Sequence, residues 1–206
     1  MKFVDFLSNS MSSTQPLTFI ILSGGKSSRM GTEKGLLKIG NFTSVEHIAN
    51  IARKFTENII LIANHPSYSK LGLPVFEDLI KNKGPLAGIY TGLFYSTNEL
   101  TIITACDMPS INQEMINHLI THINRTEIVL YGKKERAEPF PGIYRKTCMT
   151  RIKTLIKRNE LSLQNLFVQS NTLYLNKPEF TETTRNAFLN MNTMNDYETF
   201  VSDYLK

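Results

Sequence analysis

Three short apolar runs, each continuous rather than alternating, constrain the fold of this chain most. They span residues 17–23, 58–63 and 100–105. An apolar run without alternation is typical of a parallel strand whose sheet is covered by helices on both faces. Amphipathic stretches with helical spacing separate the three runs. The sequence therefore predicts an α/β fold with a single, mostly parallel sheet flanked by helices.

The remaining elements follow from the periodicity of the apolar residues. Helices are expected at residues 44–55, 84–95, 112–123, 145–158, 162–167 and 195–204. Further strands are expected at residues 127–131, 142–145 and 171–175. Gly88 and Gly92 share one face of the second helix, where the missing side chains allow close backbone approach. We expect one domain over residues 17–206, preceded by a flexible N-terminal extension over residues 1–16.

Composition narrows the class of protein. The 206 residues carry a formal charge of +5, which favours anionic partners. Cys106 and Cys148 form no CxxC pattern, so neither a disulfide framework nor a structural zinc site is expected. Residues 1–16 are a poor match to a secretory signal, and no apolar run approaches the roughly 18 residues that span a bilayer. We expect a cytoplasmic protein that binds neither nucleic acid nor membrane.

A glycine-rich loop follows the first expected strand, in the segment LSGGKSSRMGTEKGLL at residues 22–37. Glycines let backbone N–H groups approach a phosphate, and Arg29 and Lys34 supply positive charge. A Walker A loop is excluded because Ile20 stands where its first glycine is required. A dinucleotide fingerprint is excluded because Gly24 and Gly25 are adjacent. An ordinary basic turn is the alternative, but this combination of residues favours phosphate binding.

Two carboxylates also follow expected strands. Asp107 comes directly after the strand at residues 100–105, where ligands of open α/β sheets bind. Its carboxylate suits Mg²⁺, which often uses one or two carboxylates together with substrate phosphates. Asp78 follows a strand-like segment at residues 74–76. A turn-forming role before Pro109 is the alternative for Asp107, and a capping or loop role is the alternative for Asp78.

Four motifs in order resemble the molybdenum cofactor guanylyltransferase family over about residues 17–204. These are LSGG with RMG and Lys34, then GPLAG at residues 84–88, CDMP at residues 106–109 and NMNT at residues 190–193. The first motif is shared by a broad class of sugar and pterin nucleotidyltransferases, and the GPLAG and NMNT motifs narrow this class. Ser23 stands where alanine is usual, Glu33 where aspartate is common, and Met194 where proline is frequent.

The resemblance implies a Rossmann-like sheet of the nucleotide-diphospho-sugar transferase type, and it assigns roles to individual residues. The nucleotide contacts that it implies are Leu22, Ser23, Gly24, Gly25, Lys34, Asn64, Asp78 and Asp107. Asp107 is the implied ligand of Mg²⁺, and Lys34, Arg29 and Asp107 are the implied catalytic residues. The residues implied for the pterin are Glu138, Asn190 and Asn192.

The implied reaction transfers GMP from GTP to the phosphate of molybdopterin, or of the molybdenum cofactor, and releases pyrophosphate. Further expected partners are other proteins of cofactor biosynthesis or of molybdoenzyme maturation. Three alternatives stay open on the sequence. They are a cytidylyltransferase for the same cofactor, a sugar-1-phosphate nucleotidyltransferase and a non-catalytic nucleotide-binding protein.

Overall fold

The computed structural model describes residues 15–24, 33–177 and 188–204, which build a seven-stranded sheet in the order β5-β4-β1-β6-β8-β7-β9. Its strands are β1 (Leu17–Ser23), β4 (Ile59–Ala63), β5 (Val75–Phe76), β6 (Leu100–Ala105), β7 (Ile128–Lys133), β8 (Arg136–Arg145) and β9 (Thr172–Leu175). Strand β8 runs antiparallel to both of its neighbours, and the other neighbouring pairs are parallel. The predicted α/β fold with a mostly parallel sheet is confirmed.

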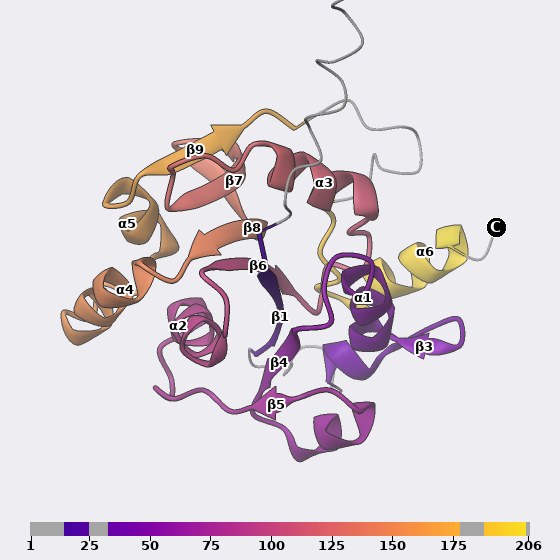
Figure 1. Cartoon of the computed structure of the whole chain (residues 1–206). Helices are drawn as coiled ribbons and strands as arrows, with labels where there is room; N and C mark the ends of the chain where they lie inside the picture. Colours follow the sequence, from indigo (N-terminus) through magenta and orange to yellow (C-terminus); the bar gives the residue numbers. More distant parts are fainter. Residues whose placement is uncertain (1–14, 25–32, 178–187, 205–206) are drawn as a thin grey trace, which may run out of the picture.

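Helices cover both faces of this sheet (Figure 1). They are α1 (Ser44–Ala52), α2 (Pro85–Tyr95), α3 (Gln113–Thr121), α4 (Cys148–Lys157), α5 (Leu163–Val168) and α6 (Met194–Tyr204). Helices α2, α4 and α5 lie on one side, and α1, α3 and α6 lie on the other. All six helices in the described ranges were predicted, with ends that differ by at most three residues.

Several short elements escaped the sequence prediction. They are the 3₁₀ turns η2 (Lys34–Leu36) and η3 (Pro66–Leu71) and the two-stranded hairpin of β2 (Lys38–Ile39) and β3 (Phe42–Thr43). The 3₁₀ turns and the two-residue strands of the hairpin show no recognisable apolar period. Two of them, η2 and η3, lie beside the candidate site described below.

Strand β8 is longer than predicted, because it begins at Arg136 rather than at Gly142. We expected Pro139 and Pro141 to precede the strand, but both lie within it. The register of β7 and β8 shifts between Val129 and Tyr131, so this part of β8 forms a bulge. Proline has no N–H to donate and is tolerated where the ladder is interrupted.

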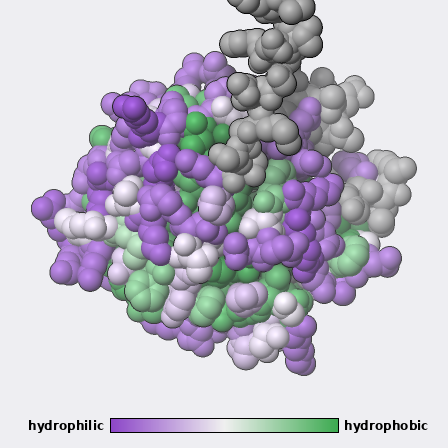
Figure 2. All heavy atoms as spheres, in the orientation of Figure 1, coloured by the Kyte–Doolittle hydropathy of each residue, from purple (hydrophilic) through white to green (hydrophobic). Residues whose placement is uncertain are grey.

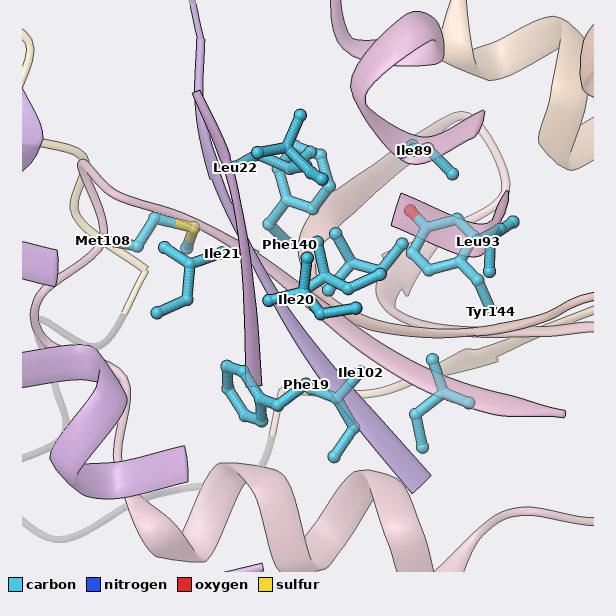
Figure 3. Close-up of a cluster of buried hydrophobic side chains, with 14 of the residues drawn as sticks. Phe19, Ile20, Ile21, Leu22, Ile89, Leu93, Ile102, Met108, Phe140 and Tyr144 are labelled. Atoms are coloured by element: carbon cyan, nitrogen blue, oxygen red, sulfur yellow. The ribbon is translucent and has the colours of Figure 1, made fainter. Parts of the chain in front are cut away.

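The core is built around β1, whose side chains alternate between the two faces of the sheet (Figure 3). Ile20 and Leu22 lie on the α2 side, where a Cβ added to Gly92 or Gly88 would come within 2.5 Å of Ile20 or 3.3 Å of Leu22. The two glycines therefore bring α2 close to the sheet, as predicted. The close packing fixes the level at which β1 ends and its loop begins.

The surface is ordinary for a folded domain. On the face in Figure 2, hydrophobic residues are visible toward the middle of the view, between more hydrophilic margins. Within the described ranges, no helix combines the length and the apolar character that crossing a bilayer requires.

A glycine at the end of β7 gives a test of this fold. Gly132 has a φ of +106°, and an added Cβ would lie 2.4 Å from the carbonyl oxygen of Arg136. Gly132→Ala should therefore destabilise the chain by about 2–4 kcal/mol, through strain and a backbone clash. Gly72→Ala is the matched control, because Gly72 also has a positive φ, of +68°, but has open space around it. Its expected cost is about 1 kcal/mol. Urea unfolding measures both, and equal losses would contradict the packing at Gly132.

Candidate active site

The candidate site lies at the edge of the sheet where the parallel strands β4, β1 and β6 end. Leu22 pairs with Ile62 on one side and with Ala105 on the other, so the three strands end at the same level. The backbone N–H of Cys106 donates to the carbonyl of Leu22 over 2.9 Å, which extends this pairing by one residue. Asp107 therefore leaves the sheet beside the end of β1, as its position in the sequence predicts.

Asp107 forms an ion pair with Lys34. The ammonium nitrogen of Lys34 lies 3.5 Å from Oδ2 of Asp107, and the two side chains are 18% and 23% exposed. Burial raises the pKa of the Asp107 carboxyl, and the positive charge of Lys34 opposes this without cancelling it. The site thus holds a poorly hydrated carboxylate next to a cation.

The C-terminal segment completes this cluster. Lys34 also donates to Oδ1 of Asn192 over 3.0 Å, and the backbone N–H of Met191 donates to the carbonyl of Asp107 over 2.8 Å. Met191 is buried, whereas Asn190 beside it is exposed. The NMNT motif therefore places Asn192 in contact with Lys34 and anchors the segment on Asp107.

The turn that presents Asn192 has a local cause. Oδ2 of Asp196 accepts from the N–H groups of Asn192 and Thr193, over 2.9 and 2.8 Å. The hydroxyl of Thr193 accepts in return from the N–H of Asp196 over 3.1 Å. This reciprocal arrangement caps the start of α6, and the sequence Thr-x-x-Asp before a helix could have predicted it.

Asn64 and Asp78 form a second polar pair near the end of β4. Asn64 donates to Oδ2 of Asp78 over 2.7 Å and accepts from the N–H of Asp78 over 3.1 Å. Oδ1 of Asp78 is buried and has no hydrogen-bond partner among the described residues. It lies 3.8 Å from the position of a Cβ on Gly88, which borders Leu22 as well. A buried acceptor without a donor suits a ligand that brings an N–H or O–H group.

Lys81 joins the Asn64–Asp78 pair, and no sequence pattern predicted it. Its ammonium donates to Oδ1 of Asn64 over 2.8 Å and to Glu77 over 2.6 Å. Only the fold of the loop after β5 brings Lys81 to Asn64, which lies 17 positions earlier. The pair therefore carries a cation at its exposed side.

The expected site residue Glu138 lies outside these clusters. Gly25 and Arg29 fall outside the described residues. Glu138 lies in β8 opposite Tyr131 and forms an ion pair of 2.8 Å with Lys177, whose ammonium lies 4.2 Å from the centre of the Phe188 ring. Lys177 was not predicted, because only the pairing of β7 with both β8 and β9 brings it near Glu138.

Comparison with known proteins identifies the family of this site. A model described as the MobA-like NTP transferase domain matches residues 19–172. The chain belongs to this family. The match confirms the resemblance seen in the motifs, and it covers β1 from Phe19 onward together with Lys34, Asn64, Asp78 and Asp107.

Two relatives and one solved structure extend this finding. The chain is 35% identical to a probable molybdenum cofactor guanylyltransferase of Carboxydothermus hydrogenoformans, over 89% of this chain and 94% of that protein. It is 27% identical to the molybdenum cofactor guanylyltransferase of Vibrio vulnificus, with the same two coverages. The molybdopterin-guanine dinucleotide biosynthesis protein A of Archaeoglobus fulgidus superposes with a TM-score of 0.73, at 19% identity, over 90% of this chain and 97% of that one. This last likeness shows a shared fold.

The raised pKa of Asp107 gives a prediction of its own. The folded chain binds the Asp107 proton more tightly than the unfolded chain does, so the stability of the ligand-free protein falls as the pH rises through the folded pKa. Asp107→Asn removes this buried charge and should make the ligand-free protein more stable at about pH 7. The difference should shrink at lower pH, for example at about pH 4, because protonation removes the same charge from the wild-type carboxyl. Urea unfolding at both values measures it, and a less stable variant at about pH 7 would contradict the direction.

Proposed function

We propose that this chain transfers GMP from GTP to the phosphate of molybdopterin, forming the guanine dinucleotide cofactor and releasing pyrophosphate. The observation that carries the proposal is the Lys34–Asp107 pair, a cation and a carboxylate 3.5 Å apart where the parallel strands end. The names of the curated relatives support the guanylyl group and the molybdenum cofactor as donor and acceptor. We further propose that residues 17–206 act as one catalytic unit in the cytoplasm.

Lys34 binds the phosphates of GTP in this proposal. An ammonium group has three N–H donors. Asn192 accepts one of them, and Oδ2 of Asp107 lies 3.5 Å from the same nitrogen. Lys34 is thereby held by two neighbours and keeps a donor for a phosphate oxygen. Because the acceptor phosphate is already anionic at neutral pH, the reaction needs positioning and charge neutralisation rather than a general base. Arg29 is proposed to neutralise the remaining phosphate charge.

Asp107 is the proposed ligand of a divalent metal, and Mg²⁺ is the proposed ion. The described residues contain no group of three or more His, Cys, Asp or Glu side chains that could hold a metal. A single half-buried carboxylate fits Mg²⁺, which completes its ligands with water and substrate phosphates. When bound, Mg²⁺ would supply charge stabilisation at the phosphate that leaves. The burial that raises the pKa of Asp107 favours this fit, because a nearby cation offsets the cost of the charge.

The nucleoside is proposed to bind along the ends of β1 and β4. Leu22, Ser23, Gly24 and Gly25 would contact it on the β1 side, with Asn64 and Asp78 opposite. The buried Oδ1 of Asp78 supports this placement, because a donor from the nucleoside would satisfy it. Glu138, Asn190 and Asn192 are proposed for the pterin, and the contact between Asn192 and Lys34 supports placing the acceptor beside the phosphates.

Two substitutions test the catalytic assignment. Lys34→Ala and Asp107→Ala should each lower kcat/KM of GMP transfer by about 10²-fold or more, because each removes charge stabilisation at the reacting phosphate. Lys153→Ala is the matched control, since it removes the same charge from the exposed side of α4 and should leave transfer unchanged. Wild-type turnover in a folded Asp107→Ala variant would refute the metal assignment.

Calorimetry with GTP, CTP, ATP and UTP in the presence of Mg²⁺ tests the nucleotide. Tight, Mg²⁺-dependent binding of GTP over CTP is expected. A preference for CTP would retain the site and move the function to cytidylyl transfer onto the same cofactor. If none of the four nucleotides binds, the proposed function is refuted.

A further inference from the structure

A series of hydrogen-bonded polar groups, most of them buried, adjoins the turn that carries Lys34. Its centre is Tyr68, which is fully buried and comes from η3, between β4 and β5. The hydroxyl of Tyr68 lies 2.5 Å from Oγ of Ser23 and 3.1 Å from Oε2 of Glu33. Ser23 is the last residue of β1, and Glu33 directly precedes Lys34. One phenol therefore links the end of the central strand to the turn of Lys34.

The direction of these hydrogen bonds follows from counting protons. A carboxylate only accepts, so the single proton of the Tyr68 hydroxyl goes to Glu33. Burial raises the pKa of Tyr68, so the phenol keeps that proton. The hydroxyl of Ser23 then donates to the oxygen of Tyr68. The hydroxyl of Tyr68 thus has one partner on either side, and this series of hydrogen bonds ends on the carboxylate of Glu33.

The other end of this series of hydrogen bonds reaches the segment that carries Asp107. Oγ of Ser23 lies 3.3 Å from Sγ of Cys106, the residue before Asp107. The Cys106 side chain is buried, and a thiol is a weak hydrogen-bond donor. Because Ser23 donates its only hydroxyl proton to Tyr68, the thiol of Cys106 is the donor in its weak contact with Ser23. The series of hydrogen bonds runs from Cys106 through Ser23 and Tyr68 to Glu33. It therefore joins the residue before Asp107 to the residue before Lys34.

Packing adds a second restraint on the same turn. A Cβ on Gly35 would lie 2.8 Å from the hydroxyl oxygen of Tyr68 and 2.9 Å from Oγ of Ser23. The backbone that follows Lys34 therefore lies directly against the hydroxyl pair, with no room for a side chain. Glu33 is held by a hydrogen bond on one side of Lys34, and Gly35 by contact on the other.

We propose that Tyr68 is a positioning residue for Lys34: through Ser23, Glu33 and Gly35 its hydroxyl sets the distance between Lys34 and Asp107. The inference rests on the proposed function, because it matters only if Lys34 binds the phosphates. Tyr68 itself need not touch a substrate. An error of about 1 Å in the position of a charged group costs up to about a hundredfold in rate, so a small shift of this turn is enough to be measured.

The same strand provides a control for the general cost of losing a buried hydroxyl. At the opposite end of β1, Oγ1 of Thr18 accepts from the hydroxyl of Ser96 over 2.9 Å, and both side chains are buried. These groups lie at the amino end of the strand, away from Lys34. Thr18→Val keeps the shape of the side chain and removes its hydroxyl, so it should reduce stability without changing transfer.

The first measurement compares Tyr68→Phe with Thr18→Val. Tyr68→Phe should lower kcat/KM by between about tenfold and a hundredfold in fully folded protein, while Thr18→Val stays within about twofold of wild type. If Tyr68→Phe does not fold, Ser23→Ala is used instead. It removes the hydroxyl that donates to Tyr68 and should also lower kcat/KM. Wild-type kcat/KM in the folded variant would overturn the inference.

The second measurement separates positioning from a purely structural role. The Kd for GTP is measured for Tyr68→Phe, for Lys34→Ala and for the double variant. If Tyr68 acts through Lys34, Tyr68→Phe should weaken binding in the wild-type background and change it by less than about twofold in the Lys34→Ala background. Equal, multiplicative losses in both backgrounds would overturn the inference while leaving the proposed function intact. Failure of the wild-type chain to bind GTP would instead refute the proposed function.

Discussion

The placement of a carboxylate and an ammonium group at a half-buried sheet edge is the constraint on which the candidate site depends. Burial works against the charge of Asp107, so its pKa is raised even with Lys34 at 3.5 Å. Such a carboxylate gains from any further cation, such as the metal ion that would accompany the nucleotide in the proposed function. The ligand-free protein therefore keeps an unfavourable charge that a substrate complex can stabilise, as expected where function requires a charge to be poorly hydrated.

Holding that pair requires segments that are far apart in the chain. Lys34 follows β1, Asp107 follows β6, and Asn192 comes from the C-terminal segment. The hydroxyl of Ser44, at the start of α1, donates to the carbonyl of Cys106 over 2.6 Å, and Met191 donates to the carbonyl of Asp107. Backbone atoms on both sides of the carboxylate are thus fixed by neighbours from different elements. The side chain can then be positioned without being neutralised.

How well each part of the site could be predicted depends on how far apart in the sequence its interacting residues lie. The bounds of β1 and β6 were predicted because their apolar runs are continuous, and their parallel pairing brings Asp107 to the end of β1. Tyr68 was not found, because its partner Ser23 lies 45 positions away and an isolated tyrosine has no local signature. Lys177 was not predicted either, because its partner Glu138 lies 39 positions earlier in the sequence. The prolines of β8 were misplaced because a bulge depends on the partner strand, which local propensity does not encode.

Tyr68 gives Ser23 and Glu33 a shared structural role. Both side chains contact the same hydroxyl. An alanine at position 23 would leave the oxygen of Tyr68 without its donor, which costs about 1–3 kcal/mol for a buried polar group. A shorter carboxylate at position 33 would reach less far toward the phenol. The hydroxyl of Ser23 and the longer side chain of Glu33 are therefore two parts of one arrangement, which Tyr68 joins.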